Sequence, residues 1–143
     1  QRLRVTLGAG AQLLIGVDAK KSRSVLEAAY NDSAGVTAAF NLNALQHLNE
    51  HLGANFKLEQ FAHEARYNVE LGCIQMFLRS LVAQQVEISG SVLEFTAGEV
   101  IHTEDSYKYQ PEEFLFLAYD AGFTKTALWQ DADAWYSLFL MHT

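Results

Sequence analysis

A series of short strand-like segments in the middle of the chain constrains the fold more than any other feature. Turn residues separate each segment from the next, so the connections are short. The segments cover residues 61–68, 74–81, 84–89, 93–95 and 100–109. Because parallel pairing needs long crossovers, we predict that these strands pair in an antiparallel arrangement.

Helical patterns lie on both sides of this region. The strongest covers residues 34–52, where one apolar stripe repeats at intervals of three and four residues. The stripe contains Ala38, Leu42, Leu45, Leu48 and Leu52, and Asn41 is expected to point away from it. The Asn31-Asp32-Ser33 sequence supplies capping side chains, and Gly53 is a suitable end. A shorter helix is predicted over residues 22–30, and another from Pro111 to about Gly122.

The two ends of the chain have the pattern of an α/β domain. Residues 1–8 indicate the end of a helix, followed by a glycine-rich turn and the apolar run Gln12–Asp18. Such a run fits a strand that is buried on both faces of a parallel sheet. Residues 123–130 and 135–142 are the last predicted strands. We therefore predict an α/β fold in which a doubly wound domain, residues 1–21 and 109–143, carries an antiparallel α+β insertion, residues 22–108.

Charge and composition exclude several classes of function. The net charge is −7 and the Lys and Arg residues form no basic run, so we expect no nucleic-acid partner. No apolar stretch is long enough to cross a bilayer, so we expect no membrane partner. Cys73 is the only cysteine and no signal peptide is evident, so we expect a cytoplasmic protein.

Generic catalytic motifs are missing from the sequence. No glycine-rich nucleotide loop, nucleophile elbow or HExxH zinc motif is found. His47 and His51 have the i, i+4 spacing of metal ligands, but no third ligand follows, so we interpret them as polar residues on a solvated helix face. Nothing beside Cys73 indicates a lowered pKa, so we interpret this residue as a partly buried structural cysteine.

The predicted strand at residues 100–109 carries a polar face. Side chains alternate along a strand, so His102, Glu104, Ser106 and Lys108 should point the same way. This face either meets solvent or forms the polar wall of a ligand pocket. In a pocket, Glu104 and Ser106 could bind the two nitrogens of an imidazole, because both accept an N–H hydrogen bond.

Two further residues allow both a structural and a functional interpretation. Tyr30 lies at a helix end, where its ring can pack while its phenol can donate to an anionic group. Met76 has the strand spacing of Ile74 and Leu78, which favours core packing.

Four blocks of sequence resemble the histidine-specific, S-adenosylmethionine-dependent methyltransferase family, whose members trimethylate histidine in ergothioneine biosynthesis. The blocks are LLIGVDAKK (13–21), AAYNDSAGVTAAFNLNAL (28–45), IQMFLRS (74–80) and FTAGEVIHTEDSYKY (95–109). The LWQD sequence (128–131) and the apolar strand after it resemble the family's ending. The resemblance covers nearly the whole chain in order. Asn31, Gln75 and Tyr109 differ from the family's usual Asp, Glu and Phe.

The resemblance implies that the chain is the C-terminal portion of a Rossmann-like methyltransferase whose antiparallel insertion binds the substrate. Tyr30 would contact the carboxylate of histidine or a related amino acid. Glu104 and Ser106 would bind the imidazole, and Met76 would line the pocket.

The resemblance also implies S-adenosylmethionine as the cofactor of the parent enzyme. In the family, a glycine-rich cofactor loop and a substrate-binding Gly-Asn lie upstream of the segment that LLIGVD resembles, and this sequence does not contain them. We therefore expect an incomplete cofactor site and no activity from this chain alone. We also expect the chain to self-associate through a sheet edge that earlier strands would otherwise cover.

Two alternatives to a histidine methyltransferase stay open. A protein of the same family could act on another amino acid or amine. Alternatively, the chain could be a non-catalytic fragment that binds an amino acid or serves a structural role.

Overall fold

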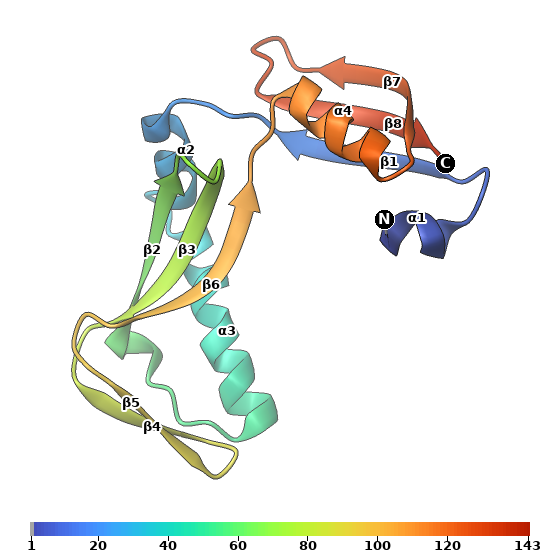
Figure 1. Ribbon diagram of the computed structural model, residues 1–143. Coiled ribbons are helices and arrows are strands. Elements are labelled where there is room, and N and C mark those ends of the chain that lie inside the picture. Colours follow the sequence, from blue (N-terminus) through green and yellow to red (C-terminus); the bar gives the residue numbers. More distant parts are fainter. Residues whose placement is uncertain (1) are drawn as a thin grey trace. The chain divides into compact units, whose positions relative to one another are not determined.

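The computed structural model describes residues 2–143 and divides into two compact units (Figure 1). The central unit is Ser22–Ser106, and the terminal unit is Gln1–Lys21 together with Tyr107–Thr143. None of the helices formed by residues 2–143 has the length and apolar character that a bilayer span requires.

The central unit contains a three-stranded sheet in the order β2-β3-β6 and a separate β4–β5 hairpin. The strands are β2 (Phe61–Asn68), β3 (Cys73–Ser80), β4 (Gln84–Ile88), β5 (Ser91–Phe95) and β6 (Val100–Tyr107). A short 3₁₀ turn, η1 (Leu58–Gln60), precedes β2. The β2–β3 and β4–β5 pairs are antiparallel, as the short connections predict.

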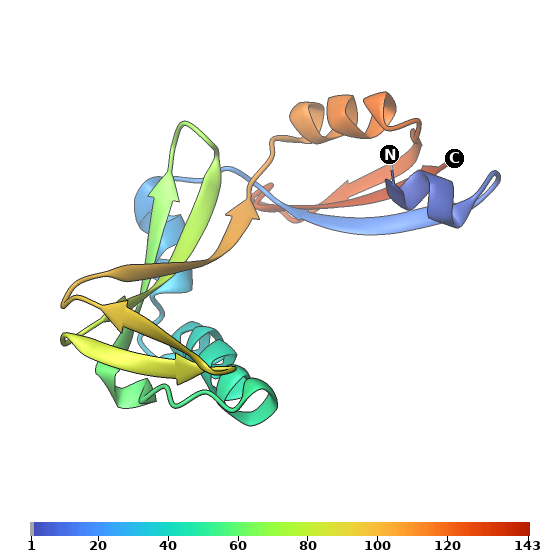
Figure 2. The same cartoon turned by 60° about the horizontal axis from the view of Figure 1, so that its bottom comes forward.

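Two helices cover one face of the β2-β3-β6 sheet (Figures 1 and 2). Helix α2 (Arg23–Tyr30) begins at the Ser22 N-cap, whose hydroxyl accepts from the Val25 N–H. Helix α3 (Val36–Leu52) ends at Gly53, which adopts a left-handed φ of 62°. The Asp32 carboxylate accepts from the first N–H groups of α3, and these bonds lower the pKa of Asp32. The sequence signals for both helices are thus confirmed.

The core of the central unit consists of two apolar clusters between these helices and the sheet. In one cluster Leu45 from α3 packs against strand residues that include Phe61 and Leu78. In the other, Leu26 from α2 packs against Ala65, Ile74 and Met76. Each helix therefore buries its apolar side against its own part of the sheet, which fixes where its polar side chains lie.

The terminal unit contains a second three-stranded sheet, in the order β1-β8-β7, with both strand pairs antiparallel. Its elements are α1 (Arg2–Leu7), β1 (Gln12–Asp18), α4 (Pro111–Asp120), β7 (Thr124–Gln130) and β8 (Tyr136–His142). The expectation that Gln12–Asp18 is buried in a parallel sheet is wrong for this part of the chain. Strand β1 lies at the edge of the sheet, and Leu14 is 60% exposed.

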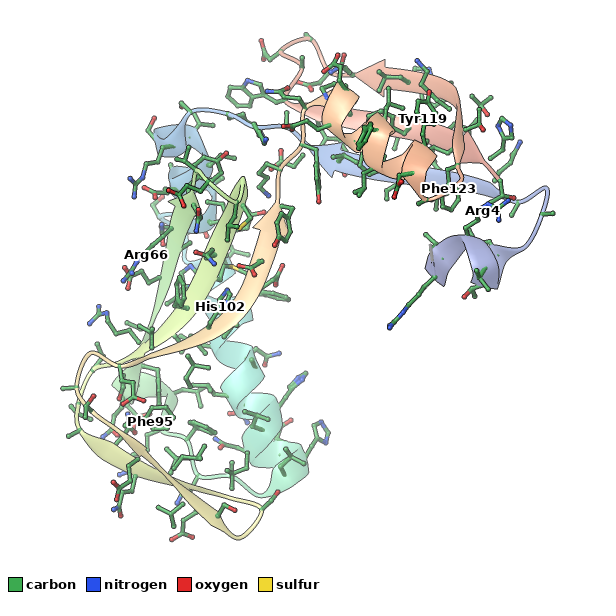
Figure 3. All side chains as sticks on the ribbon, in the orientation of Figure 1. Arg4, Arg66, Phe95, His102, Tyr119 and Phe123 are labelled. Carbon is green, nitrogen blue, oxygen red and sulfur yellow. The ribbon has the colours of Figure 1, made fainter. Side chains whose placement is uncertain are left out.

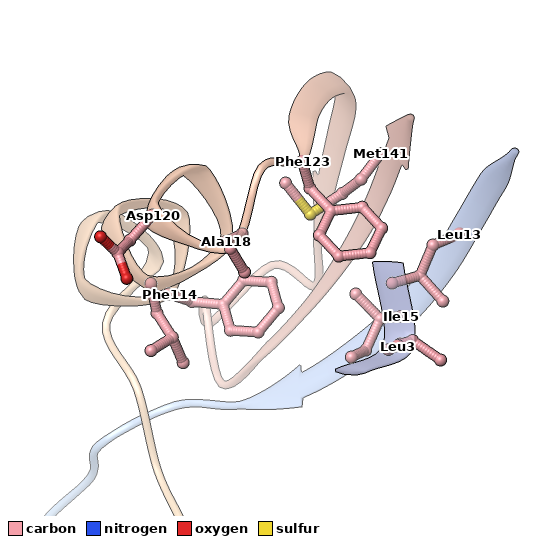
Figure 4. Close-up of a pocket in the computed structure, with 10 residues that line it drawn as sticks. Leu3, Leu13, Ile15, Phe114, Ala118, Asp120, Phe123 and Met141 are labelled. Carbon is pink, nitrogen blue, oxygen red and sulfur yellow. The ribbon is translucent and has the colours of Figure 1, made fainter. Parts of the chain in front are cut away.

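Helix α4 covers one face of the terminal sheet and forms its core. Phe114 and Ala118 of α4 face Phe123 and Met141 across this interface (Figure 4). A cavity of about 330 Å³ lies beside this core, and its only charged lining residue is Asp120. Because a binding site for a polar metabolite needs several convergent polar groups, we do not regard this cavity as a substrate site.

A buried lysine connects two segments of the terminal unit. The sequence placed Lys108 on a polar face with Glu104 and Ser106, but its side chain is only 1% exposed. The Lys108 Nζ lies 3.1 Å from Asp18 Oδ2 at the end of β1, and the Tyr109 N–H donates to the Asp18 carbonyl. Lys108 is therefore an internal ion-pair residue of the terminal unit, because burial of the ammonium requires a nearby carboxylate.

Candidate functional site

Two of the sequence-predicted site residues lie in direct contact within the central unit. The Tyr30 Oη is 2.8 Å from the Ser106 Oγ, although the residues are 76 positions apart in the sequence. Tyr30 is the last residue of α2, and Ser106 lies near the end of β6. Both hydroxyls can donate and accept, so the pair offers two adjacent hydrogen-bonding groups to a polar ligand.

Met76 belongs to the buried cluster against which Tyr30 packs. Its side chain is 2% exposed, and the cluster also contains Leu26, Ala65 and Ile74. The Thr103 hydroxyl on β6 donates to the Met76 carbonyl at 3.0 Å and joins the two strands. Met76 therefore sits in the floor that supports the Tyr30 ring.

Glu104, the fourth predicted residue, lines a surface cavity of about 270 Å³ between β6 and α3. The helix contributes residues that the sequence interpretation did not single out as ligand contacts. They are Phe40, Asn41, Asn43, Ala44 and His47. Their spacing of three and four residues places them on one side of α3, a signal that was available in the sequence. The His47 Nε2 lies 3.2 Å from the Asn43 Nδ2.

The predicted polar face of β6 is interrupted between His102 and Asp105. His102 lies on β6 (Figure 3), and its Nε2 is 2.9 Å from the Asp105 Oδ1. The His102 ring stacks on Phe77. Residues three apart on a regular strand point to opposite faces, so this contact means that simple alternation fails here. The prediction that His102 shares one face with Glu104 and Ser106 is therefore wrong.

Side-chain hydrogen bonds attach the end of α2 to β2 close to Tyr30. The Asn31 side chain accepts from the Ala65 N–H and donates to the Ala65 carbonyl, both at 3.0 Å. The Glu27 carboxylate accepts from the Tyr67 N–H at 2.9 Å, and this bond is the main reason that the pKa of Glu27 is lowered. These contacts fix the helix end that carries the Tyr30 phenol.

A model of the family described as histidine-specific, SAM-dependent methyltransferases matches residues 1–143. The chain belongs to this family.

Individual relatives agree with this assignment. This family member is 43% identical over 128 residues to a histidine N-alpha-methyltransferase of Mycolicibacterium smegmatis. The aligned region covers 88% of this chain and 40% of the relative. It is 32% identical to ergothioneine biosynthesis protein 1 of Neurospora crassa, over 86% of this chain and 14% of that protein. It is 29% identical to the L-tryptophan methyltransferase of Psilocybe serbica, over 90% of this chain and 37% of that protein. The chain thus spans well under half the length of these relatives.

In the part of the methyltransferase family member that the structure describes, no glycine-rich turn leads from a parallel strand into a helix. In dinucleotide-type folds a glycine-rich turn leads from a parallel strand into a helix, whose N–H groups hold the ligand. Within residues 2–143, the strand-to-helix connections after β1 and β6 contain no glycine, and β1 pairs only with the antiparallel β8. Among the same residues, no group of three or more His, Cys, Asp or Glu side chains is arranged to hold a metal ion.

Proposed function

We propose that the chain is the C-terminal, substrate-binding portion of an S-adenosylmethionine-dependent methyltransferase that methylates the α-amine of histidine. The observation that carries the proposal is the 2.8 Å contact between Tyr30 and Ser106, with Glu104 on the same strand as Ser106. Residues that the resemblance assigns to one ligand come together from separate elements. The name of the Mycolicibacterium smegmatis relative supports the same reaction for the parent protein, meaning the longer protein of which this sequence would be a part.

In this proposal the central unit is the substrate-binding insertion and the terminal unit is part of a Rossmann-like domain. The division of the chain at Lys21 and Ser106 supports that organisation. Tyr30 donates its phenol to the substrate carboxylate, and Glu104 and Ser106 bind the imidazole nitrogens. Met76 supports the pocket from below.

These groups act by orientation and selection. A methyl transfer depends on an amine that is held in line with the methyl donor, and fixed orientation supplies much of the rate gain in such reactions. A pocket that hydrogen-bonds both imidazole nitrogens rejects side chains without them, because its polar groups would be left unpaired. The cofactor would bind to residues of the parent protein outside this sequence.

A panel of amino acids tests the proposal with the parent protein. We expect methylation of histidine with a kcat/KM at least about 100-fold above that for phenylalanine or leucine, since unpaired polar groups in the pocket oppose those side chains. Ser106→Ala should lower the preference for histidine, whereas Ser91→Ala at the β5 end of the central unit serves as a matched control. A parent protein with equal activity on histidine and leucine would contradict the proposal.

A second candidate substrate follows from the tryptophan methyltransferase relative. An indole has one N–H donor and no acceptor, so a tryptophan pocket needs only one of the two polar groups that an imidazole uses. The same panel separates the two cases. Tryptophan as the preferred substrate would replace histidine in the proposal and would leave the family assignment unchanged.

A further inference from the structure

A partly buried series of hydrogen bonds runs from β3 through α3 and β2 to the last residue of α2. The Asn41 Nδ2 lies 3.1 Å from the Phe77 carbonyl and 2.9 Å from the His63 Nδ1. The His63 Nε2 lies 2.8 Å from the carbonyl oxygen of Tyr30. Asn41 is 4% exposed, which corrects the expectation that it points away from the core.

The carbonyl oxygens of Phe77 and Tyr30, at the two ends, determine the direction of every hydrogen bond in this series. A backbone carbonyl only accepts, so the Asn41 atom facing Phe77 must be its NH₂ group. The same NH₂ group faces the His63 Nδ1, which therefore accepts and carries no proton. The Nε2 faces another carbonyl, that of Tyr30, and therefore donates. His63 is thus held as the neutral tautomer with its proton on Nε2.

The bond to Tyr30 satisfies a group that the helix leaves open. Carbonyls in the last turn of an α-helix have no partner within the helix. Tyr30 is the last residue of α2, and its carbonyl receives the His63 N–H. The phenol of the same residue contacts Ser106. His63 therefore fixes the backbone from which the phenol projects.

We propose that His63, oriented by Asn41, is a positioning residue for the Tyr30 phenol in the substrate pocket. The inference rests on the proposed function, because it assumes that Tyr30 contacts the substrate. His63 itself does not touch the substrate. It acts through the main chain of Tyr30, so its loss affects amino-acid binding more than cofactor binding.

The tautomer is tested by nitrogen NMR on the isotope-labelled 143-residue chain at neutral pH. We expect the nitrogen chemical shift of His63 Nδ1 to be that of an unprotonated imidazole nitrogen. The chemical shift of Nε2 should be that of a protonated one. This measurement needs no substrate and no knowledge of the reaction. A proton on Nδ1, or a doubly protonated ring, would overturn the inference regardless of the function.

The positioning role is tested in the parent protein with two amides at position 63. In His63→Gln the amide nitrogen reaches the place of Nε2 and retains the donor to Tyr30. In His63→Asn the shorter side chain reaches only the place of Nδ1. We expect His63→Asn to weaken histidine binding about tenfold and His63→Gln by less than about threefold, as for one positioned hydrogen bond. Equal losses in the two variants would overturn the inference.

Asn49→Ala is the matched control for general damage to the central unit. The Asn49 side chain makes a comparable pair of bonds, both at 2.8 Å, to the main chain of Phe56, which belongs to the Leu45 cluster. We expect it to lower the thermal stability of the protein without changing histidine affinity. A loss of histidine affinity equal to that in His63→Asn would mean that His63 is only structural, and would overturn the inference.

Glu104→Ala distinguishes failure of this inference from failure of the proposed function. If Glu104→Ala weakens histidine binding while the two His63 variants behave alike, the inference is wrong and the proposed function stands. If Glu104→Ala leaves histidine binding unchanged, the proposed function is wrong. The NMR result then still decides whether His63 carries its proton on Nε2. The proposed positioning role is wrong in that case, because it depends on the proposed function.

Discussion

The central and terminal units bury their apolar surface in different ways. In the central unit α2 and α3 cover the β2-β3-β6 sheet and form two clusters, and Met76 and Tyr30 belong to or pack against the cluster that contains Leu26. In the terminal unit only the α4 face of the sheet is covered. Leu14, Trp129 and Tyr136 are each at least half exposed, and β1 is an open edge. Exposed apolar surface and open sheet edges are where other protein segments bind, so this surface of the terminal unit is available for further contacts.

The largest loss of stability is expected from a substitution that creates a cavity in the core of the central unit. Leu78→Ala removes a side chain that is fully buried, and should lower the free energy of unfolding by about 3 kcal/mol. Both tryptophans, Trp129 and Trp135, lie in the terminal unit, so their fluorescence reports on that unit alone. The urea midpoint of the central unit, monitored by amide exchange in β2 and β3, should move to a lower concentration. The urea midpoint monitored by tryptophan fluorescence should not change. Equal shifts in both signals would show that the two units unfold together.

The next largest effect is expected in the terminal unit. Asp18→Ala removes the carboxylate that contacts the buried Lys108 ammonium. The free energy of unfolding should fall by about 2 kcal/mol. This is below the usual value for a buried pair, because the Asp18 side chain is 27% exposed. Here the tryptophan fluorescence transition should move to lower urea while amide exchange in β3 stays unchanged. The opposite pattern would contradict the assignment of this ion pair to the terminal unit alone.

Acid should weaken the attachment of α2 to β2 through Glu27. The Tyr67 N–H lowers the pKa of Glu27 in the folded chain, so this bond stabilises the fold above the ordinary pKa of a glutamate. The stabilisation is lost as the pH falls below about 4 and passes through the lowered value. Thermal unfolding of the central unit should therefore depend less on pH, between about pH 6 and pH 3, in Glu27→Gln than in the unsubstituted chain. An identical pH dependence of unfolding in the two proteins would contradict a stabilising role for the Glu27 bond.

The smallest effect concerns the open edge of the terminal unit. We expect weak self-association of the 143-residue chain through β1, and sedimentation velocity should reveal it as a rise in mean mass with concentration. Leu14→Lys places a charge on this edge strand and should reduce the association. Leu93→Lys, on the exposed β5 strand of the central unit, is the matched control and should not. A monomer at all concentrations would contradict this expectation.

Local features of the fold were predictable from the sequence because short connections and caps act locally. The strands of the central unit and both of its helices follow from turn residues, the Asp32 cap and Gly53. The pairing of Gln12–Asp18 was not predictable, because an apolar run does not determine which strands lie beside it. The burial of Asn41 was missed because only its long-range partners, Phe77 and His63, make burial of the amide favourable.

The candidate site was predictable only in part. The resemblance supplied Tyr30, Met76, Glu104 and Ser106, but no pattern in the sequence gives the contact between the first and last of these, which depends on tertiary structure. The interruption at His102 was missed because alternation assumes a regular strand. His63 had no local signal, since its role depends on three elements that meet only in the folded unit.

The central claim is that the central unit carries the amino-acid pocket of a histidine methyltransferase. Calorimetric titration of the parent protein with Glu104→Ala tests it most directly, with S-adenosylhomocysteine and histidine as separate ligands. We expect histidine affinity to fall at least about tenfold, because one imidazole partner is lost, while the affinity for S-adenosylhomocysteine changes less than about twofold. Equal losses for the two ligands, or no loss for histidine, would contradict it.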